Sequence, residues 1–553
     1  MASLALVVAC SQPPSLSGTE EIPGDRLTDW TYAGIPGGIP ERQSIHRTLR
    51  PGASARDINA AIAAASGTGQ VVFLEAGIYR LDEPVDIGAA TDVTLRGAGA
   101  GRTVLEFSAP GRFSVVSEPT RYFDPAIRGG EDVVSGLTRG STRITLASAA
   151  PRTFRPGALV QIVQDDDGRL VFRRKGNWAG ARNLRHTSRI IEVKGRDVVF
   201  ATPIPYSFEA SRRPQANAMA VNARLVGVED LTIDARGKLG LTFGGADRCW
   251  IRRVETRGTG NSAIEFRGSS QCEVRRCFLH DAQGYPRQGD GYGVFLFYGS
   301  GYCRVEDNIG SRLANLVLIN GASGCAVLYN LDEEGGRAGL PWVMPSFNCN
   351  HGPHGIMNLF EGNVIARFQN DGYHGSASHM FLLRNRVHGL HPEHTFERQL
   401  VDLTRGSYYH SLVGNVLGDR SWKPDAYEMS GNPGHGDSCV YQLGYPNADN
   451  TSLVPETEFE GFRSVLPDPK VRETLLRIGN YDYFHRRVIG DGEATPRTLP
   501  PSLAYAAKPG YFGSLAWPAI GPDVDGLAGD IPAQVRWAAF TRSRDARDLF
   551  RDP

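Results

Sequence analysis

The sequence predicts an all-β fold, a parallel β-helix with a small β insertion and a C-terminal tail that contains short helices. Two observations predict the solenoid. The chain contains 65 glycines in 553 residues, which favours frequent tight turns. A six-residue frame rich in Val, Ile and Leu also recurs, with starts separated by 23, 31, 22, 33, 22 and 30 residues, at 249, 272, 303, 325, 358, 380 and 410. A repeat this short suits one coil of a β-helix better than a helical hairpin of about 34 residues.

Two positions of the frame indicate an inward stack. The first position is Cys in four copies, Cys249, Cys272, Cys303 and Cys325, and the sixth is Asn in five copies, Asn308, Asn330, Asn363, Asn385 and Asn415. Stacked buried Asn side chains can hydrogen-bond from coil to coil. Free Cys is a small, readily buried side chain, so we predict core thiols rather than disulfides or metal ligands. We therefore expect the frames to form one parallel sheet, with His410 as a further core residue.

The segments before and after the ladder complete the predicted architecture. Ser54 and Asp57 can cap a helix over 58–65, and short strands follow at 71–74, 77–79, 85–87 and 93–95. We place the β-helix at 31–430, with a β insertion at about 112–222. The Pro-rich segment 431–553, with helices near 470–478 and 533–550, is expected to wrap the solenoid and cover an exposed end.

Charge and composition exclude several classes of partner. Lys plus Arg and Asp plus Glu each number 60, so the chain has no net field to attract nucleic acid or an anionic membrane. With 41% apolar and 22% charged residues the chain is globular, and we expect a monomer. No stretch approaches the roughly 18 apolar residues of a membrane helix.

The first 30 residues predict export. Residues 1–10 form a short apolar run, and Val7-Val8-Ala9-Cys10 resembles the box at which bacterial lipoproteins are cleaved and lipidated on Cys. We expect a periplasmic, cell-surface or extracellular protein, with any membrane attachment through a lipid on Cys10. Changing Cys10 to Ala should then release the protein from the membrane fraction, and an unchanged distribution would count against this hypothesis.

The capped start, the segments QVVFLEAGIYRL (70–81) and DVTLRGAG (92–99), and the coil ladder together resemble the pectate-lyase-like superfamily of right-handed parallel β-helices. The resemblance covers roughly residues 30 to 430, and later segments look like a bacterial subgroup to which we attach no activity. It implies a right-handed coil and a carbohydrate-active protein, either a polysaccharide lyase, a glycoside hydrolase or, less often, a noncatalytic spike or adhesin. The Asp-Pro-His signature of alginate epimerases is absent from the sequence, so no particular sugar is implied.

Equivalent positions on successive coils should form a straight polar stripe. Strands that precede the ladder frames end in residues that would line it, namely Arg267, Tyr298, Asn320, His351 or His354, His374 and Arg405. Six coils span roughly 24 Å, the length of several sugar rings. We predict that Arg267, Tyr298, Asn320 and His351 bind a polysaccharide, because these side chains suit acidic groups, ring stacking and hydroxyls. Long insertions at 281–292, 331–351 and 389–399 are expected to form walls around this groove.

Three functions fit such a stripe. The leading hypothesis is β-elimination on a uronate-containing chain, with His354 or His374 as the base and Arg405 or Arg267 stabilising the enolate. The alternative is a glycoside hydrolase with paired carboxylates, for which Asp290, Glu361 and Asp371 are the candidates. The third is a noncatalytic glycan binder.

Metal binding is not assigned from the sequence. His351 and His354 lack an assured third ligand, and the run 165–168, Asp-Asp-Asp-Gly, is expected to be a solvated hairpin tip. Calcium is left open as a cofactor.

Overall fold

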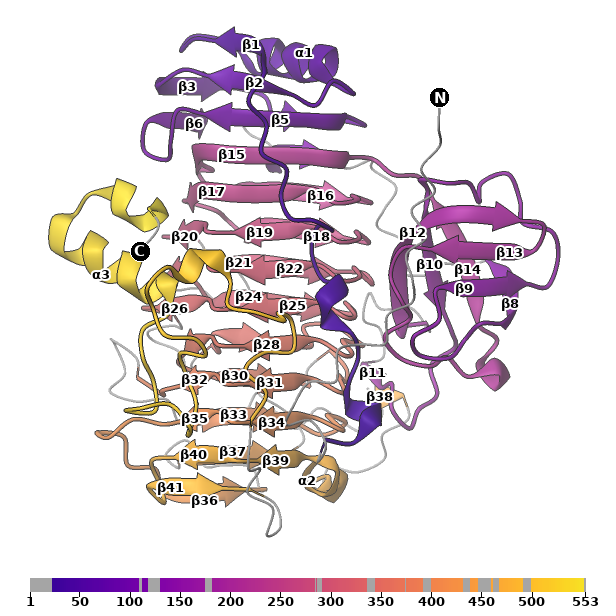
Figure 1. Ribbon diagram of the computed structural model, residues 1–553, viewed down its shortest axis with the longest axis vertical. Coiled ribbons are helices and arrows are strands. Elements are labelled where there is room, and N and C mark those ends of the chain that lie inside the picture. Colours follow the sequence, from indigo (N-terminus) through magenta and orange to yellow (C-terminus); the bar gives the residue numbers. More distant parts are fainter. Residues whose placement is uncertain are drawn as a thin grey trace.

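A computed structural model describes residues 22–108, 112–117, 130–174, 182–283, 285, 291–335, 344–372, 374–390, 399–430, 438–445, 459–460, 467–490 and 499–551. Two long sheets of mostly parallel strands stack coil upon coil along the molecule (Figure 1), one with 22 strands and one with 11. The predicted parallel β-helix is confirmed. No helix in the described ranges is long and apolar enough to cross a membrane.

The larger sheet, which we call sheet A, bends once in each coil, so most coils contribute two of its strands. Its strands are β1 (Ile45–Leu49), β2 (Gln70–Leu74), β3 (Gly77–Leu81), β5 (Thr91–Gly97), β6 (Thr103–Phe107), β15 (Arg224–Asp234), β17 (Trp250–Arg257), β19 (Glu273–Arg275), β20 (Phe278–His280), β22 (Arg304–Glu306), β23 (Ile309–Ser311), β25 (Ala326–Leu328), β26 (Leu331–Glu333), β28 (Leu359–Glu361), β29 (Val364–Ile365), β31 (Phe381–Leu383), β32 (Arg386–Val387), β34 (Ser411–Val413), β35 (Val416–Leu417), β39 (Leu476–Ile478), β40 (Asn480–Asp482) and β41 (Arg487–Ile489).

The smaller sheet, which we call sheet B, contributes one strand to most coils. Its strands are β4 (Val85–Asp86), β7 (Phe113–Ser117), β16 (Leu239–Gly244), β18 (Ser262–Arg267), β21 (Tyr292–Phe297), β24 (Asn315–Asn320), β27 (Phe347–Asn348), β30 (Phe368–Asn370), β33 (Gln399–Leu403), β36 (Ala426–Met429) and β37 (Cys439–Leu443). Helix α1 (Ala55–Ala65) is capped by Ser54 and Asp57 as predicted. The other helices are α2 (Pro469–Thr474) and α3 (Pro532–Ser543), with short 3-10 turns at Gly24–Arg26, Trp30–Tyr32, Ala210–Arg212, Gly510–Phe512 and Ala546–Phe550.

The bend of sheet A carries the predicted Asn ladder. The fifth residue of each frame has a positive φ, for example +58° at Asp307 and +66° at Gly362, so the chain turns and the next side chain points inward. Each Asn Nδ2 donates to the Oδ1 of the next Asn at 2.8–3.0 Å, through Asn308, Asn330, Asn363, Asn385, Asn415 and Asn480. The stacked, buried ladder is therefore confirmed, and it contains one rung, Asn480, beyond those predicted.

Removing one Asn side chain from the ladder should destabilise the fold. In Asn363→Ala, the backbone N–H and the Nδ2 of Asn330 lose the oxygen that accepts both at 2.9 Å. Since buried unsatisfied donors cost about 1–3 kcal/mol each, we expect a loss of about 2–4 kcal/mol in the free energy of unfolding. Denaturant titration measures it, and a loss below about 0.5 kcal/mol would contradict a structural ladder.

The cysteines and His410 occupy the core as predicted. All seven described cysteines are free and buried, and the backbone N–H of Cys249 donates to Cys272 Sγ at 3.4 Å. Burial raises the pKa of the Cys272 thiol well above its ordinary value. His410 Nδ1 accepts from the backbone N–H of Met380 at 3.0 Å, so the imidazole replaces Cys in the same stack.

The β insertion is a closed barrel beside the coils (Figure 1). Its strands are β8 (Glu131–Ser135), β9 (Arg143–Leu146), β10 (Leu159–Val163), β12 (Arg185–Lys194), β13 (Asp197–Phe200) and β14 (Gln215–Met219), and a separate pair joins β11 (Arg173–Arg174) to β38 (Phe459–Glu460). The barrel packs on the turns that leave sheet B, where Gln161 Nε2 donates to the Tyr298 carbonyl at 2.8 Å. It therefore flanks one side of sheet B.

The aspartates of the run 165–168 are bonded to protein donors. Asp165 pairs with Arg182 at 2.9 Å, Asp166 accepts from the Asn183 backbone at 2.7 Å, and Asp167 accepts from the Leu170 backbone at 2.7 Å. Within the described ranges, no group of three or more His, Cys, Asp or Glu side chains is placed to hold a metal ion.

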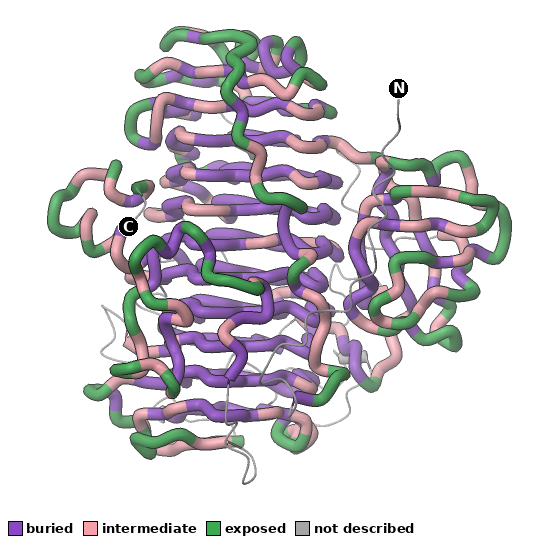
Figure 2. Tube along the Cα trace, in the orientation of Figure 1, coloured by how far each residue is buried: buried purple, intermediate pink, exposed green. Residues whose placement is uncertain are grey.

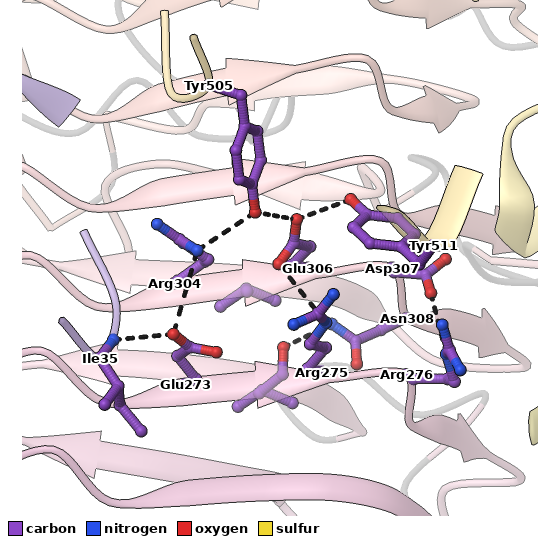
Figure 3. Close-up of polar contacts among 12 residues, drawn as sticks. Ile35, Glu273, Arg275, Arg276, Arg304, Glu306, Asp307, Asn308, Tyr505 and Tyr511 are labelled. Carbon is purple, nitrogen blue, oxygen red and sulfur yellow. Dashed lines mark hydrogen bonds and ion pairs between the residues drawn. The ribbon is translucent and has the colours of Figure 1, made fainter. Parts of the chain in front are cut away.

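The outer face of sheet A is covered by both ends of the described chain. Residues 22–35 and 499–551 cross it in Figure 1 and bury apolar side chains against it. Figure 2 shows the coil strands buried along most of their length. Figure 3 shows polar side chains beneath the C-terminal segment, where the Tyr511 hydroxyl donates to Glu306 at 2.6 Å. The tail thus covers part of the outer face of sheet A.

Candidate functional site

The outer face of sheet B carries an aromatic patch, which we define as Tyr292, Phe295 and Phe297. Val294 and Leu296 point into the main core, so the intervening Phe295 points outward, where it packs with Tyr292 in a separate small apolar cluster. Tyr292 and Phe295 are only 2% and 3% exposed, so Phe297, which is part-exposed, is the ring of the patch on which a sugar ring can stack.

A His–Asp pair lies next to this patch. The ring of His351 lies 5.6 Å from that of Tyr292, and its Nδ1 lies 3.5 Å from Asp371 Oδ2. The His374 ring meets the His351 ring edge-on at 4.5 Å. Asn348 Nδ2 donates to Asp371 Oδ2 at 2.8 Å and fixes the carboxylate. The structure thus brings together three predicted site residues, His351, Asp371 and His374.

The electrostatics of the pair suit proton transfer. Burial alone would raise the pKa of Asp371, but the hydrogen bond and charge of His351, with the charge of His374, outweigh burial and lower it. The side chain of His351 is 25% exposed, whereas that of Asp371 is 11% exposed. Because Nδ1 faces the carboxylate, Nε2 is the nitrogen directed away from it. A carboxylate that orients an imidazole in this way leaves the second nitrogen to accept or donate a proton.

A second carboxyl lies on the neighbouring coil of the same face. Asp402 accepts from Arg367 Nη2 at 2.6 Å and from Gln369 Nε2 at 2.8 Å. Burial raises the pKa of Asp402 to about 6, although Arg367 opposes the shift. Asp402 pairs in register with Gln369, two residues before Asp371. Asp371 follows the end of β30 at Asn370, so the two aspartates lie on neighbouring coils and are offset by two residues along the chain.

The other residues of the predicted stripe lie at the ends of sheet B strands. Arg267, Phe297 and Asn320 are in register, so Phe297 holds the position expected for Tyr298. Tyr298 instead follows the strand with a φ of +51°, which carries it into the turn beside the barrel. The three remaining members, Arg267, Asn320 and Arg405, are each at most 4% exposed. Arg267 forms a buried ion pair with Glu265.

His354 is not placed to act as the predicted base. It is fully buried, its Nδ1 lies 3.0 Å from Ser376 Oγ and its Nε2 lies 2.8 Å from Ser378 Oγ. Burial lowers the pKa of His354 to about 4, so the imidazole is neutral. The turn after Asn350 sends His351 outward and His354 inward. The two histidines therefore cannot share a ligand, and of the two only His351 is part-exposed.

These buried histidines predict acid sensitivity. Burial lowers the pKa of His186, His354 and His410 to about 3, 4 and 3, against about 6.5 in an unfolded chain. Between these pKa values the unfolded state binds protons that the folded state excludes. The contribution of the three histidines to the free energy of unfolding is therefore complete above pH 6.5 and falls as the pH drops. Each contributes at most about 1.4 kcal/mol per pH unit. We expect a lower melting temperature at pH 5 than at pH 7, and equal values would contradict neutral buried imidazoles.

Glu361 is also not available to a ligand. It occupies an outward position, as predicted, but on sheet A, where it accepts from the Tyr329 hydroxyl at 2.6 Å and from the Leu503 backbone at 2.8 Å. The C-terminal segment covers it, and burial raises its pKa. Glu361 therefore lies on a different sheet from Asp371 and cannot form the predicted carboxylate pair with it. Asp290 lies outside the described residues.

Sequence reasoning missed Asn348, Gln369 and Asp402. A signal for Asp402 was present, because it alternates with the apolar residues Val401 and Leu403 and such a strand exposes its polar residue on the outer face.

Comparisons with known proteins add structural likenesses of low identity. No protein-family model matches the chain, and no curated protein matches its sequence. The tailspike of Pseudomonas phage phi297 aligns over 82% of this chain and 76% of its own, at 13% identity and a TM-score of 0.39. Alginate lyase from Paenibacillus sp. FPU-7 aligns over 72% of this chain and 98% of its own, at 12% identity and a TM-score of 0.38. Polygalacturonase from Erwinia carotovora aligns over 74% of this chain and 96% of its own, at 12% identity and a TM-score of 0.33. Likeness at this level carries no argument for activity, which rests on the site itself.

Proposed function

We propose that the chain binds and cleaves a polysaccharide on the outer face of sheet B, with His351 as the proton-transferring group. The observation that carries this proposal is the part-exposed imidazole of His351, held by the buried carboxylate of Asp371 beside the aromatic patch. Stacking on the part-exposed ring of Phe297 would position a sugar, and the oriented imidazole would reach one of its protons.

The preferred reaction is β-elimination on a uronate-containing chain. His351 Nε2 takes the C5 proton, the C4–oxygen bond breaks with formation of a C4–C5 double bond, and the imidazolium of His351 returns a proton to the leaving oxygen. The enolate that precedes bond cleavage needs a cation or hydrogen-bond donor. His374, edge-on to His351 at 4.5 Å, is the nearest such group in the described site. Arg267 and Arg405 are at most 4% exposed, and Arg267 lies three coils before the coil of His351, so neither is placed to take this role.

Hydrolysis is the second candidate, favoured by the opposite pKa shifts of two carboxyls. The raised pKa of Asp402 suits a general acid and the lowered pKa of Asp371 suits a base. Inversion requires two carboxyls roughly 6.5–9.5 Å apart, and Asp371 and Asp402 lie on neighbouring coils of the same face. Asp402 is fully buried, however, whereas His351 is part-exposed, and this difference ranks elimination first.

Incubation with a panel of uronate-containing and neutral polysaccharides tests the proposal. Ultraviolet absorbance reports unsaturated ends, and a colorimetric assay reports reducing ends. Both signals together support elimination, and reducing ends alone support hydrolysis. Binding without either signal across the panel would overturn both reactions in favour of a noncatalytic glycan binder. Repeating the panel with calcium and with a chelator would show whether the ion is required.

A further inference from the structure

A groove runs between the barrel and the first coils of the β-helix, away from the His351–Asp371 pair. Its volume is about 470 Å³, and residues from three places line it: the connection between β9 and β10, the end of β14 with the following linker, and the starts of β5 and β15. Two folded units thus meet along it.

The groove is basic. Arg152, Arg155 and Arg224 line it, and its lining residues include no Asp or Glu. Arg152 and Arg155 are exposed, so their guanidinium groups can rearrange around a ligand. This excess of positive charge is local, since the whole chain has a formal net charge of +0.

More arginines lie directly behind the groove. Asp247 is fully buried, and its Oδ2 lies 3.0 Å from Arg248 Nη2 and 3.5 Å from Arg189 Nε. Arg224 also interacts electrostatically with this carboxylate. The single carboxylate of Asp247 therefore interacts with three guanidinium groups.

The groove adjoins sheet B at its N-terminal coils. Met219, one of its lining residues, lies against Gly268, where an added Cβ would be 3.9 Å from Met219 Cε. Gly268 directly follows Arg267, the first member of the predicted stripe. The groove therefore lies beside the turn that follows β18, next to the end of this sheet B strand.

We propose that this arginine groove is a subsite for an acidic sugar unit, one that bears a carboxylate or a sulfate, on the polysaccharide bound by sheet B. The proposal rests on the proposed function for the identity of its ligand. Planar guanidinium groups bind both anions through paired hydrogen bonds, which gives selectivity over neutral sugars. The subsite would select acidic chains at a distance from the reacting bond.

Calorimetric binding of oligosaccharides to the full-length protein tests the subsite. Three probes are compared, a polyuronate, a sulfated and a neutral oligosaccharide. We expect Arg152→Ala/Arg155→Ala to weaken binding of one acidic probe by about tenfold or more, because hydrogen bonds to charged groups each contribute about 1.5–3 kcal/mol. Which acidic probe responds identifies the anion. The matched control is Arg143→Ala/Arg196→Ala, which removes the same charge from exposed barrel positions that do not line the groove and should bind as the wild type does.

The subsite and the proposed function fail in different ways. If the polysaccharide panel yields no product but the groove variant still weakens acidic binding, the subsite stands without the enzyme. If the groove variant binds both acidic probes as tightly as the control variant does, the subsite is wrong whatever the panel shows. Equal weakening for a DNA oligonucleotide would also overturn it, since the groove would then attract anions without regard to sugar.

Discussion

His351→Asn should lower kcat by about 10²–10⁴-fold on any polysaccharide that the protein cleaves, the usual contribution of a positioned acid or base. Asparagine keeps a polar side chain near Asp371, but its amide cannot act as a base near neutral pH. Because the imidazole is part-exposed and asparagine keeps a polar group beside Asp371, the melting temperature should change little. Initial rates and a thermal melt on the same preparations measure both quantities.

Two further variants make this result specific. His46→Asn is the matched control, since His46 is exposed on β1 of sheet A and should retain full activity. Asp371→Asn should also lower kcat and shift the pH profile, because Asp371 acts through the imidazole that it orients. Wild-type turnover in His351→Asn would remove His351 from the reaction.

Arg536→Ala should cost about 3–5 kcal/mol of unfolding free energy, the range for breaking a buried ion pair by removing one partner. Arg536 is 2% exposed and its Nη1 lies 2.9 Å from Oδ1 of the fully buried Asp307. Its Nε also donates to the Leu549 carbonyl at 2.8 Å, so the same side chain joins α3 to the chain end and to sheet A. Denaturant titration measures the loss.

The control for Arg536 lies on the same tail. Arg547 pairs with Asp545 at the surface, and exposed pairs contribute little to stability. Arg547→Ala should therefore unfold as the wild type does. Equal stability of the Arg536 and Arg547 variants would show that the tail is not held by the pair with Asp307.

The coil ladder could be predicted because its signal is local and repeated. Each frame carries its own inward positions, and neighbouring frames reinforce the same register, as at Asn330 and Asn363. Asn480 continues the ladder but follows Asn415 after 65 residues rather than 22 to 33, so the period is lost before the pattern returns. The long insertion between Asn415 and Asn480 therefore prevented the prediction of this last Asn of the ladder.

The site could be predicted only in part because side-chain direction in a turn does not follow the ladder. Spacing in sequence favoured His351 and His354 as one pair, yet the turn between them leaves His351 part-exposed and buries His354 against Ser376 and Ser378. Glu361 shows a second reason. Its outward position is predicted correctly from the frame. Residues near Leu503, which lies 142 positions later in the sequence, cover this side chain, and no local sequence pattern indicates such a contact.

The most direct test of the central claim compares the products of His351→Asn and Asp402→Asn on one polyuronate. The account predicts that the wild type releases unsaturated ends, that His351→Asn loses this absorbance by about 10²-fold or more, and that Asp402→Asn retains most of it. Reducing ends without unsaturated product, abolished in Asp402→Asn and retained in His351→Asn, would contradict the account and establish hydrolysis.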